Sequence, residues 1–511
     1  MAIVEPCEPS GARRRLRLRS AVTLEPIGEI ECADAEDVRR ALERARAAQR
    51  AWAELSFEER AVPLWRLLDL FVRRQDDVVD VVMRETGKTR SEAISMEVFA
   101  PCDAIAYYAK NARRFLAPER RRIHGLMGLA KKLRVVYKPL GVVGLITPWN
   151  GPVALSVNPT VQALMAGNAV LHKPSEVAPL SAQLLAELYR EAGLPDGLYQ
   201  VLLGDGETGA ALVAAGVDKI SFTGSVATGR QVGEICGREL IPCTLELGGK
   251  DAMIVCADAD LDRAAEGALL GSCMNTGHYC CATERVYAVE SVYDAFVERV
   301  VARARALRQS DTGESDVGAV FWDRQLATIE RHVEEARAAG ASVLVGGRRN
   351  PALRGLYYEP TVVTGVTHEM ALMREETFGP VVAIMQVRDE DEAVRLANDS
   401  RYGLNANVWT RDGERGFRLA QRLDAGGVNV NDMAITYGIP EAPFGGVKES
   451  GVGRVNGREG IRGYCHVQPI TADRRGRGRI QGGYPYTRKA EDGMQKLIRL
   501  YFGTRLARWL S

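Results

Sequence analysis

The chain has 511 residues, of which 46% are hydrophobic and 26% charged, values typical of a globular protein with two or three domains. Its 67 basic and 66 acidic residues leave a net charge of +1, which gives no indication of nucleic acid as a partner. Ten scattered cysteines are too few for a disulfide framework and lack zinc-ligand spacing, so we expect reduced thiols, no metal and a cytoplasmic location.

The N-terminal part of the chain begins with a basic segment and continues as helices. Arginines between positions 13 and 17 have no long apolar run beside them, which predicts a solvated arm rather than a signal peptide or a membrane span. Charged residues and alanines alternate at helical spacing over 34–54. Ser56 and Glu59 then form a capping box, which predicts the start of a second helix.

From about residue 141 the pattern changes to short apolar runs separated by helices. The runs predict buried strands at 142–146, 169–171, 200–203 and 219–222, and the stretches between them predict helices at 179–192, 207–215 and 226–237. This alternation predicts an α/β fold with a parallel, doubly wound sheet, which binds nucleotides beyond the carboxyl ends of its strands. A second alternating stretch covers 251–450, and the basic segment 117–140 is extended in character.

A thiol lies in a glycine-containing segment of the second stretch. Gly277 precedes Cys280, and small or polar residues surround both, which suits a loop whose backbone N–H groups face the sulfur. Such surroundings lower the pKa of a thiol and supply a donor to an oxyanion. An inert, buried cysteine is the alternative for Cys280, as it is for most of the other nine.

Two polar side chains at strand ends can complete this chemistry. Glu246 ends an apolar strand and precedes a Gly-Gly pair, so its carboxylate can move and serve as a general base. Asn150 follows the strand at 142–146 and can point its amide N–H₂ into the same cleft as an oxyanion donor. A surface carboxylate and a turn asparagine are the alternatives.

Three further segments favour a bound nucleotide. The glycine turn at 224–229 precedes a predicted helix, whose N-terminus can bind a phosphate. Glu176 follows another strand and can accept hydrogen bonds from ribose hydroxyls. Glu376 and Phe378 offer a carboxylate and an aromatic ring to a nicotinamide and its ribose.

Taken together, these segments resemble the aldehyde dehydrogenase superfamily, over about residues 25–470 and in the family's order. The motifs that carry the resemblance are Pro148–Asn150, Lys173–Glu176, Phe222–Ser225, Glu246–Lys250, the Cys280 segment, Glu376–Pro380 and the run 443–454. The resemblance implies a Rossmann-type cofactor domain (1–116 and 141–246), an α/β catalytic domain (247–450) and a small oligomerisation β-element (117–140 and 451–471). It also implies a homodimer or a homotetramer.

The resemblance further implies a role for each matching residue. Cys280 would be the nucleophile, Glu246 the base that activates the hydrolytic water, and Asn150 the oxyanion donor. An aldehyde would be oxidised with NAD to the carboxylic acid through a thiohemiacetal and a thioester. The residues implied to contact the cofactor are Thr147, Pro148, Trp149, Lys173, Ser175, Glu176, Gly204, Phe222, Gly224, Ser225, Leu247, Gly248, Glu376 and Phe378.

Cofactor and substrate preference follow from a few of these positions. Glu176 favours NAD over NADP because a carboxylate at the ribose repels a 2′-phosphate, although Lys173 offsets part of the repulsion. The positions implied to line the aldehyde tunnel are Gly151, Leu155, Asn158, Gly438 and Phe444. Several are small where relatives often carry aromatic residues, which predicts a wide tunnel and a bulky, aromatic or long-chain aldehyde.

One position departs from the family's pattern. His278 stands two residues before the implied nucleophile, where the family usually has glutamine or glutamate. A histidine here can titrate and tune the thiolate, or it can fill a structural position. We favour the structural role.

The last forty residues, 472–511, form a basic extension beyond most of the family. Its apolar residues fall on one helical face: Met494, Leu497, Ile498, Tyr501 and Phe502. A basic amphipathic helix at 493–511 can make peripheral contact with an anionic membrane, or it can pack on the enzyme or a sister subunit. We favour packing because Gly503 interrupts the apolar face.

Two other functions stay open. A family member that passes the thioester to coenzyme A is the first, and Glu246 counts against it because a water-activating base does not help a thiol acceptor. A catalytically inactive scaffold of the same fold is the second, and the presence of Cys280, Glu246 and Asn150 counts against it.

Overall fold

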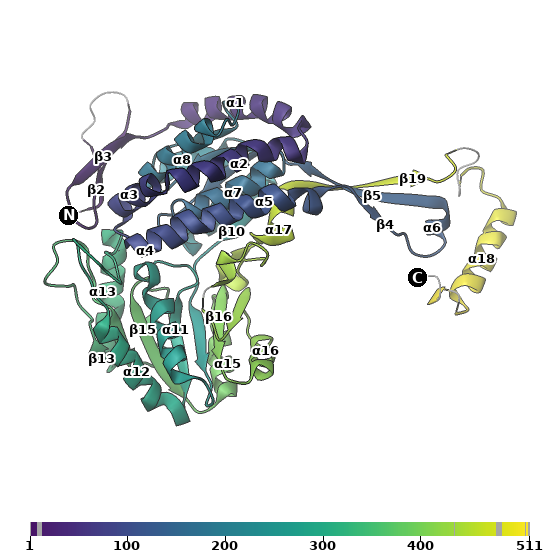
Figure 1. The fold of residues 1–511 in the computed structure, drawn as a ribbon. Coiled ribbons are helices and arrows are strands. Elements are labelled where there is room, and N and C mark those ends of the chain that lie inside the picture. Colours follow the sequence, from purple (N-terminus) through teal and green to yellow (C-terminus); the bar gives the residue numbers. More distant parts are fainter. Residues whose placement is uncertain (1, 8–12, 434, 477–482, 506, 509–511) are drawn as a thin grey trace.

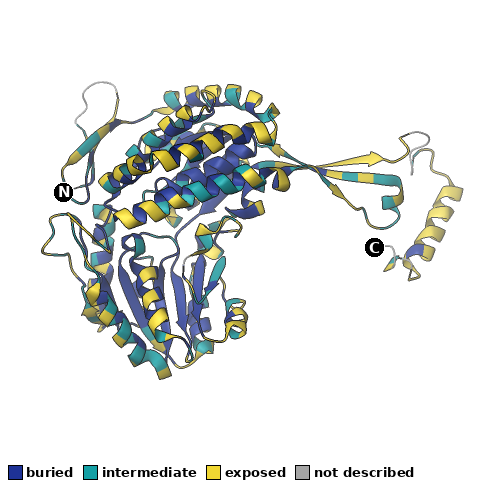
Figure 2. Ribbon diagram, in the orientation of Figure 1, coloured by how far each residue is buried: buried dark blue, intermediate teal, exposed yellow. Residues whose placement is uncertain are grey.

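The computed structural model describes residues 2–7, 13–433, 435–476, 483–505 and 507–508. Two α/β bodies lie against each other, and a long arm extends from the first body to a helix near the C-terminus (Figure 1). Buried strands form the centre of both bodies, whereas exposed residues gather on the outer helices and along the arm (Figure 2).

The first body is built on a six-stranded sheet in the order β18-β10-β9-β6-β7-β8. Five of its strands pair in parallel, and β18 runs antiparallel to β10. The strands are β6 (Val142–Ile146), β7 (Ala169–Lys173), β8 (Tyr199–Val201), β9 (Lys219–Thr223), β10 (Cys243–Glu246) and β18 (Gly451–Val452). The predicted parallel sheet is confirmed, although β8 lies slightly earlier than the predicted run at 200–203.

Helices cover this sheet in two groups. The first group consists of α1 (Ala35–Glu54), α9 (Gly206–Ala214) and α10 (Val226–Glu239), and α9 contacts the other two. A second group consists of α7 (Ala154–Met165) and α8 (Pro179–Glu191), backed by α2 (Phe57–Arg73), α3 (Gln75–Thr86) and α5 (Ala100–Leu116). The predicted capping box is present, since the Ser56 side chain accepts from the backbone N–H of Glu59 and the Glu59 side chain accepts from that of Ser56.

The basic N-terminal segment is a strand and not a solvated arm, so that prediction is wrong. A three-stranded antiparallel sheet contains β1 (Val4–Pro6), β2 (Arg15–Arg19) and β3 (Pro26–Glu31). In β2, arginines alternate with the buried Leu16 and Leu18, and this two-residue period is the pattern of a half-buried strand. The exposed arginines pair with neighbouring acids, as Arg17 does with Glu29.

The second body has a seven-stranded sheet in the order β13-β14-β15-β12-β11-β16-β17. Its strands are β11 (Asp251–Val255), β12 (Thr283–Val289), β13 (Ser342–Val345), β14 (Thr361–Thr364), β15 (Val381–Val387), β16 (Asn405–Trp409) and β17 (Gly427–Val430). The helices around them are α11 (Leu261–Cys273), α12 (Tyr293–Ala306), α13 (Asp323–Ala338), α15 (Glu390–Asn398) and α16 (Gly413–Ala420). Strands β11, β12, β14 and β16 are buried along their whole length, as expected for parallel strands covered on both faces.

The arm is a three-stranded antiparallel sheet made by two segments far apart in the chain. It consists of β4 (Glu119–Arg121), β5 (Lys131–Pro139) and β19 (Cys465–Asp473), in the order β19-β5-β4. Residues 466–473 of β19 are all exposed, and one edge of this strand carries no partner among the described residues.

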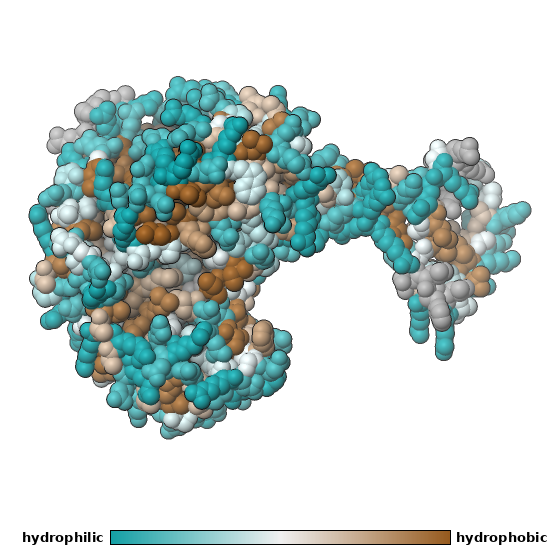
Figure 3. All heavy atoms as spheres, in the orientation of Figure 1, coloured by the Kyte–Doolittle hydropathy of each residue, from teal (hydrophilic) through white to brown (hydrophobic). Residues whose placement is uncertain are grey.

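Helix α18 (Arg488–Phe502) lies at the far end of the arm, away from both bodies (Figure 1). Tyr501 is buried there beside Gly125, where an added Cβ would lie 2.8 Å from its hydroxyl. Met494, Leu497, Ile498 and Phe502 remain exposed, and Figure 3 shows these hydrophobic residues gathered on α18 beside a largely hydrophilic arm. The helix thus packs only through a small part of its apolar face. Among the described residues, no helix is long and apolar enough to cross a membrane.

Candidate active site

A cavity lies between the two bodies, at the carboxyl ends of β6, β9 and β10. It brings together predicted residues from six separate motifs. Those that line it are Pro148, Trp149, Asn150, Leu155, Asn158, Gly224, Ser225, Glu246, Leu247, Gly248, Cys280, Glu376, Phe378 and Phe444. Thr223, which belongs to the Phe222–Ser225 motif but had no predicted role, also lines it. The lining residues that lie outside every motif are Pro159, Ser221, Trp322, Gln325, Thr328, Tyr437 and Val455.

Eight predicted residues lie outside the cavity lining. They are Thr147, Gly151, Lys173, Ser175, Glu176, Gly204, Phe222 and Gly438. Most surround the ends of β6, β7 and β8, on the side where the adenosine half of a dinucleotide would extend. Gly438 instead lines a smaller neighbouring cavity together with Asn158 and Tyr437. Gly151 lies against Leu155, whose side chain would be 3.2 Å from a Cβ at that position.

Cys280 follows a short turn with unusual backbone geometry. In this 3₁₀ turn (Met274–Gly277), Asn275 and Thr276 have φ of 55° and 56°, and Gly277 follows with φ of 74°. Left-handed conformations are costly for residues other than glycine and persist where surrounding contacts enforce them. The Glu92 carboxylate provides such a contact, since it accepts from the backbone N–H of Asn275 at 2.5 Å.

The thiol of Cys280 lies in surroundings that favour the thiolate. A hydrogen bond from the Cys281 side chain lowers the Cys280 pKa, and the backbone N–H groups of Cys281 and Cys280 lower it further, against the opposing effect of burial. The second thiol shows the opposite behaviour, because burial and the neighbouring Cys280 raise the pKa of Cys281. Cys280 is therefore the more readily ionised thiol of the pair, and Cys281 is a donor to it.

The Asn150 side chain is held in one orientation. Its Nδ2 donates to the carbonyl of His278 at 3.0 Å, which fixes the amide nitrogen on the side of the Cys280 loop. An amide nitrogen carries two N–H groups, so the second remains available to a ligand in the cavity. The Asn275 side chain donates to the carbonyls of both Asn150 (2.8 Å) and His278 (2.6 Å), which joins the two segments.

Glu246 is a buried carboxylate without a hydrogen-bond partner among the described residues. Neither of its oxygens is bonded, and burial raises its pKa well above the usual range, with a further contribution from the charge of Cys280. An unpartnered buried carboxyl facing a cavity fits a site for water. Gly445 leaves room for movement, since a Cβ there would lie 2.9 Å from Glu246 Oε1.

The first body offers a cradle for a dinucleotide. Ser225 caps the N-terminus of α10, where free backbone N–H groups suit a phosphate. Two glycines keep the approach open: a Cβ at Gly224 would lie 2.7 Å from the Phe222 ring, and one at Gly248 would lie 2.2 Å from the Glu376 carboxylate. Burial raises the Glu376 pKa to about 8. The hydroxyl groups of a bound ribose would give this buried carboxyl hydrogen-bond partners. These residues fit a nicotinamide dinucleotide.

Lys173 and Glu176 form an ion pair of 3.3 Å at the carboxyl end of β7. Both belong to the motif predicted to hold the adenosine ribose. Lys173 is buried and Glu176 half-buried, so the carboxylate is the group more open to a ligand. Gly204 stands nearby, after β8, where a Cβ would lie 2.1 Å from the Thr208 hydroxyl.

Among the described residues, no group of three or more histidines, cysteines or acids could hold a metal ion.

His278 lies at the centre of an aromatic cluster. Its ring stacks on Phe378 with centroids 5.6 Å apart and meets Trp149 and Phe321 edge-on. Its Nδ1 lies 2.8 Å from the carbonyl of Phe378, and its Nε2 accepts from the backbone N–H of Phe321 at 3.3 Å. This arrangement fixes a neutral ring with the proton on Nδ1, and burial lowers the His278 pKa to about 3.

Because His278 is neutral throughout the neutral pH range, we expect His278→Gln to leave the shape of the pH–rate profile unchanged. The variant should lose stability instead, since glutamine cannot replace the ring contacts. The measurement is kcat/KM against pH for both proteins, with a thermal melt beside it. A displaced limb in the profile would show that His278 titrates in catalysis.

Comparisons with known proteins agree with this geometry. The model of the aldehyde dehydrogenase family matches residues 8–470. A protein of Mycolicibacterium smegmatis, provisionally named succinate-semialdehyde dehydrogenase [NADP(+)], is 42% identical over 470 residues, covering 91% of this chain and 90% of its own. The 4,4'-diapolycopene aldehyde oxidase of a Methylomonas species is 38% identical, with coverages of 91% and 87%.

Solved structures give the same answer. The Mycobacterium tuberculosis aldehyde dehydrogenase complexed with NAD⁺ superposes with a TM-score of 0.86 at 35% identity, covering 91% of this chain and 95% of its own. Family model, relatives and solved structure all span nearly the whole length, and the chain therefore belongs to the aldehyde dehydrogenase family, as an NAD(P)-dependent enzyme that oxidises aldehydes.

Proposed function

We propose that this enzyme oxidises an apolar, bulky, aromatic or long-chain aldehyde to its carboxylic acid. The cavity lining carries the proposal: aromatic and aliphatic side chains from Trp149, Leu155, Tyr437 and Phe444 surround the approach to Cys280, and none of the described lining residues is lysine or arginine. Its charged residues are Glu246 and Glu376, both acidic. A substrate with a second carboxylate, such as succinate semialdehyde, would meet no cation there.

The reaction would begin with the Cys280 thiolate attacking the aldehyde carbon, which forms the C–S bond of a thiohemiacetal. The free N–H of Asn150 Nδ2 and the backbone N–H of Cys280 would stabilise the oxyanion, and one such donor is worth about 10²–10³-fold in kcat. When bound, the oxidised nicotinamide accepts the hydride that leaves this carbon, and a thioester remains on Cys280.

Glu246 would then remove a proton from the water that attacks the thioester. The C–S bond breaks, the acid leaves and Cys280 returns to the thiolate. The buried, unpartnered carboxyl of Glu246 supports this hydrolytic step over transfer to coenzyme A. The same three residues argue against an inactive scaffold.

We also infer that NAD is preferred over NADP. The more exposed member of the Lys173–Glu176 pair is the carboxylate, which would accept hydrogen bonds from ribose hydroxyls and repel a 2′-phosphate.

Residues 1–116 and 141–246 would form the cofactor domain, 247–450 the catalytic domain, and 117–140 with 451–471 the oligomerisation element. Oligomers are typical of the family, and the open edge of β19 supports a homodimer or homotetramer built through the arm. None of the ten cysteines forms a disulfide, which supports a location in the reducing cytoplasm.

The test is cofactor reduction by the purified protein with aldehydes of graded length and ring size, each with NAD and with NADP, without coenzyme A. We expect kcat/KM to rise with apolar surface, and succinate semialdehyde to be a poor substrate. We expect kcat/KM to rise about tenfold for every 1.4 kcal/mol by which burial of apolar substrate surface stabilises the transition state. Turnover that waits for coenzyme A would favour the acylating function, and equal efficiency on short and long aldehydes would remove the case for an apolar substrate.

For the tail, we propose peripheral contact with an anionic membrane. Basic residues crowd the tip of the arm, including Arg120, Arg121, Lys131 and Lys132, in a groove that also exposes Leu129. Helix α18 adds exposed apolar residues flanked by further basic ones. A surface that combines cations with apolar side chains suits anionic lipid headgroups. The exposure of this face favours lipid over packing on the enzyme's own body.

Sedimentation with vesicles tests this contact. The full-length protein should bind vesicles containing phosphatidylserine, more weakly at high salt and hardly at all with Leu497→Glu/Ile498→Glu. Leu240→Glu, an exposed residue on α10's end, is the matched control. Failure to bind, or binding that the double variant leaves intact, contradicts the proposal. If the double variant instead dissociates an oligomer, the apolar face of α18 binds a second copy of the chain.

A further inference from the structure

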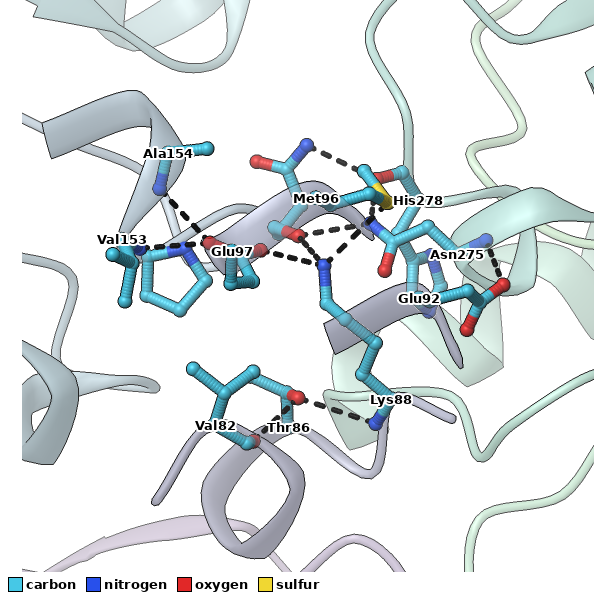
Figure 4. A network of polar contacts seen from close by, with 12 residues as sticks. Val82, Thr86, Lys88, Glu92, Met96, Glu97, Val153, Ala154, Asn275 and His278 are labelled. Atoms are coloured by element: carbon cyan, nitrogen blue, oxygen red, sulfur yellow. Dashed lines mark hydrogen bonds and ion pairs between the residues drawn. The ribbon is translucent and has the colours of Figure 1, made fainter. Parts of the chain in front are cut away.

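We propose that the buried Lys88–Glu97 ion pair is a positioning element for the oxyanion site. It would hold the main chain from the Asn150 carbonyl to the start of α7, so that the side-chain amide meets the oxyanion. Figure 4 shows Lys88 and Glu97 with Val153 and Ala154. The inference rests on the proposed function, because it concerns the donor that Asn150 supplies to the thiohemiacetal. Neither residue lines the cavity, and both would act through Asn150.

The pair holds the second half of the turn between β6 and α7. Lys88 Nζ lies 2.7 Å from Glu97 Oε1 and also donates to the carbonyl of Asn150 at 3.2 Å. The second oxygen, Glu97 Oε2, accepts from the backbone N–H groups of Val153 (3.0 Å) and Ala154 (2.9 Å), where α7 begins. Both side chains are fully buried. Residues 150–154 are thus fixed at their first carbonyl and at their last two N–H groups.

Fixing the Asn150 carbonyl also fixes the direction of its side chain. That carbonyl accepts from two donors, Lys88 Nζ and Asn275 Nδ2. The side-chain Nδ2 of Asn150 donates to the carbonyl of His278, on the segment that leads to Cys280. If Lys88 is removed, the carbonyl keeps only the Asn275 contact, and the turn can rotate. A displacement of a fraction of an ångström is enough to weaken an oxyanion donor.

A π-helix lies between Glu92 and the end of Glu97's turn and sets the directions of these two acids. Between α4 (Arg90–Glu92) and α5, residues Ala93–Phe99 form the π-helix η1, in which the N–H of Ala100 donates to the carbonyl of Ser95. Residues five apart lie roughly 140° apart around an α-helix, and closer to the same face where hydrogen bonds run from i to i+5. Glu92 and Glu97 can therefore both turn toward the active site. Glu92 holds Asn275 while Glu97 holds α7.

A purely structural pair would behave differently when removed. Removing one partner of a buried ion pair leaves an uncompensated buried charge, so a structural role predicts a loss of stability. A positioning role instead predicts a loss of kcat that depends on the presence of Asn150. The two roles separate in a double-mutant cycle, because residues that act through a shared group are not additive.

The experiment compares Lys88→Met and Glu97→Gln in the wild-type and Asn150→Ala backgrounds. We expect each to lower kcat by about tenfold or more in the wild type, with the KM for NAD and the rate of Cys280 alkylation by iodoacetamide within about twofold. In the Asn150→Ala background, neither should lower kcat further. Glu85→Gln is the matched control, since the buried Glu85 caps α8 through Leu180 and Ser181 in the same way but lies outside this network.

Equal fold-losses of kcat in both backgrounds, or a kcat unchanged by both substitutions, would overturn the proposal. So would a slowed alkylation of Cys280, which would indicate damage to the nucleophile's own loop. If Lys88→Met fails to fold, Glu97→Gln carries the test alone. A wild-type enzyme without turnover on any aldehyde would instead refute the proposed function, which separates the two failures.

Discussion

Glu246→Gln should stop the enzyme after the first half of its reaction. The thiohemiacetal and the hydride transfer need Cys280 and Asn150, which the substitution leaves in place. Hydrolysis of the thioester needs a base, and general-base catalysis contributes about 10²–10⁴-fold. We therefore expect a burst of about one reduced nicotinamide per active site, followed by a steady-state rate lower by that factor. Rapid-mixing absorbance measures both phases, and mass spectrometry detects the acyl group on Cys280.

The pH dependence of hydrolysis provides a second readout for this variant. Because burial raises the pKa of Glu246, its carboxyl stays protonated to a higher pH than that of an ordinary glutamate, and the protonated form cannot accept a proton from water. The wild-type hydrolysis rate should therefore rise with pH as Glu246 ionises, and the glutamine variant should lack this limb. Glu207→Gln, on an exposed carboxylate, is the control. Steady turnover by Glu246→Gln without a burst would show that Glu246 is not the base in thioester hydrolysis.

Gly277→Ala should disable the enzyme through its backbone. A Cβ at this position would lie 2.1 Å from the carbonyl oxygen of Gly379, and the φ of 74° is itself costly for alanine by roughly 1–2 kcal/mol. The clash falls on backbone atoms, so the turn before Cys280 must move. We expect a lower melting temperature and a loss of kcat beyond tenfold, together with slower alkylation of Cys280.

Gly413→Ala is the matched control for that variant, because an added Cβ there meets no atom within 4 Å and helix α16 favours alanine. Its melting temperature should stay the same or rise. A fully active Gly277→Ala protein with an unchanged melt would mean that the turn adapts, and that its left-handed geometry is not required for the nucleophile.

The strands of the first body were predictable because each carries its own local signal. Val142–Ile146 is a short apolar run between glycines and polar turns, so its burial in a parallel sheet follows from composition. The capping box at Ser56 and Glu59 is equally local, since both partners lie within one turn of helix. The basic strand Arg15–Arg19 shows the limit of such reasoning, because its charge concealed a two-residue period.

The support behind the active site was not predictable in this way. Glu97 contacts Val153 across 56 positions, and Glu92 contacts Asn275 across 183. Nothing in the residues near either acid indicates burial, and charged side chains are normally assigned to the surface. The π-helix that orients them also has no periodic signal. Motifs could therefore indicate Asn150 and Cys280, but the groups that hold them become visible only when the chain is folded.

The titratable groups that line the cavity are all acids, and this has a consequence for product release. Glu246, Glu376 and Cys280 carry negative charge or none, and no described residue of the lining balances them with a cation. A nicotinamide ring is positive before it accepts hydride and neutral afterwards. The same cavity therefore attracts the oxidised cofactor electrostatically and loses that attraction once the reaction has occurred. In the roles proposed for them, the residues of the cavity would thus also favour exchange of the spent cofactor for a fresh one.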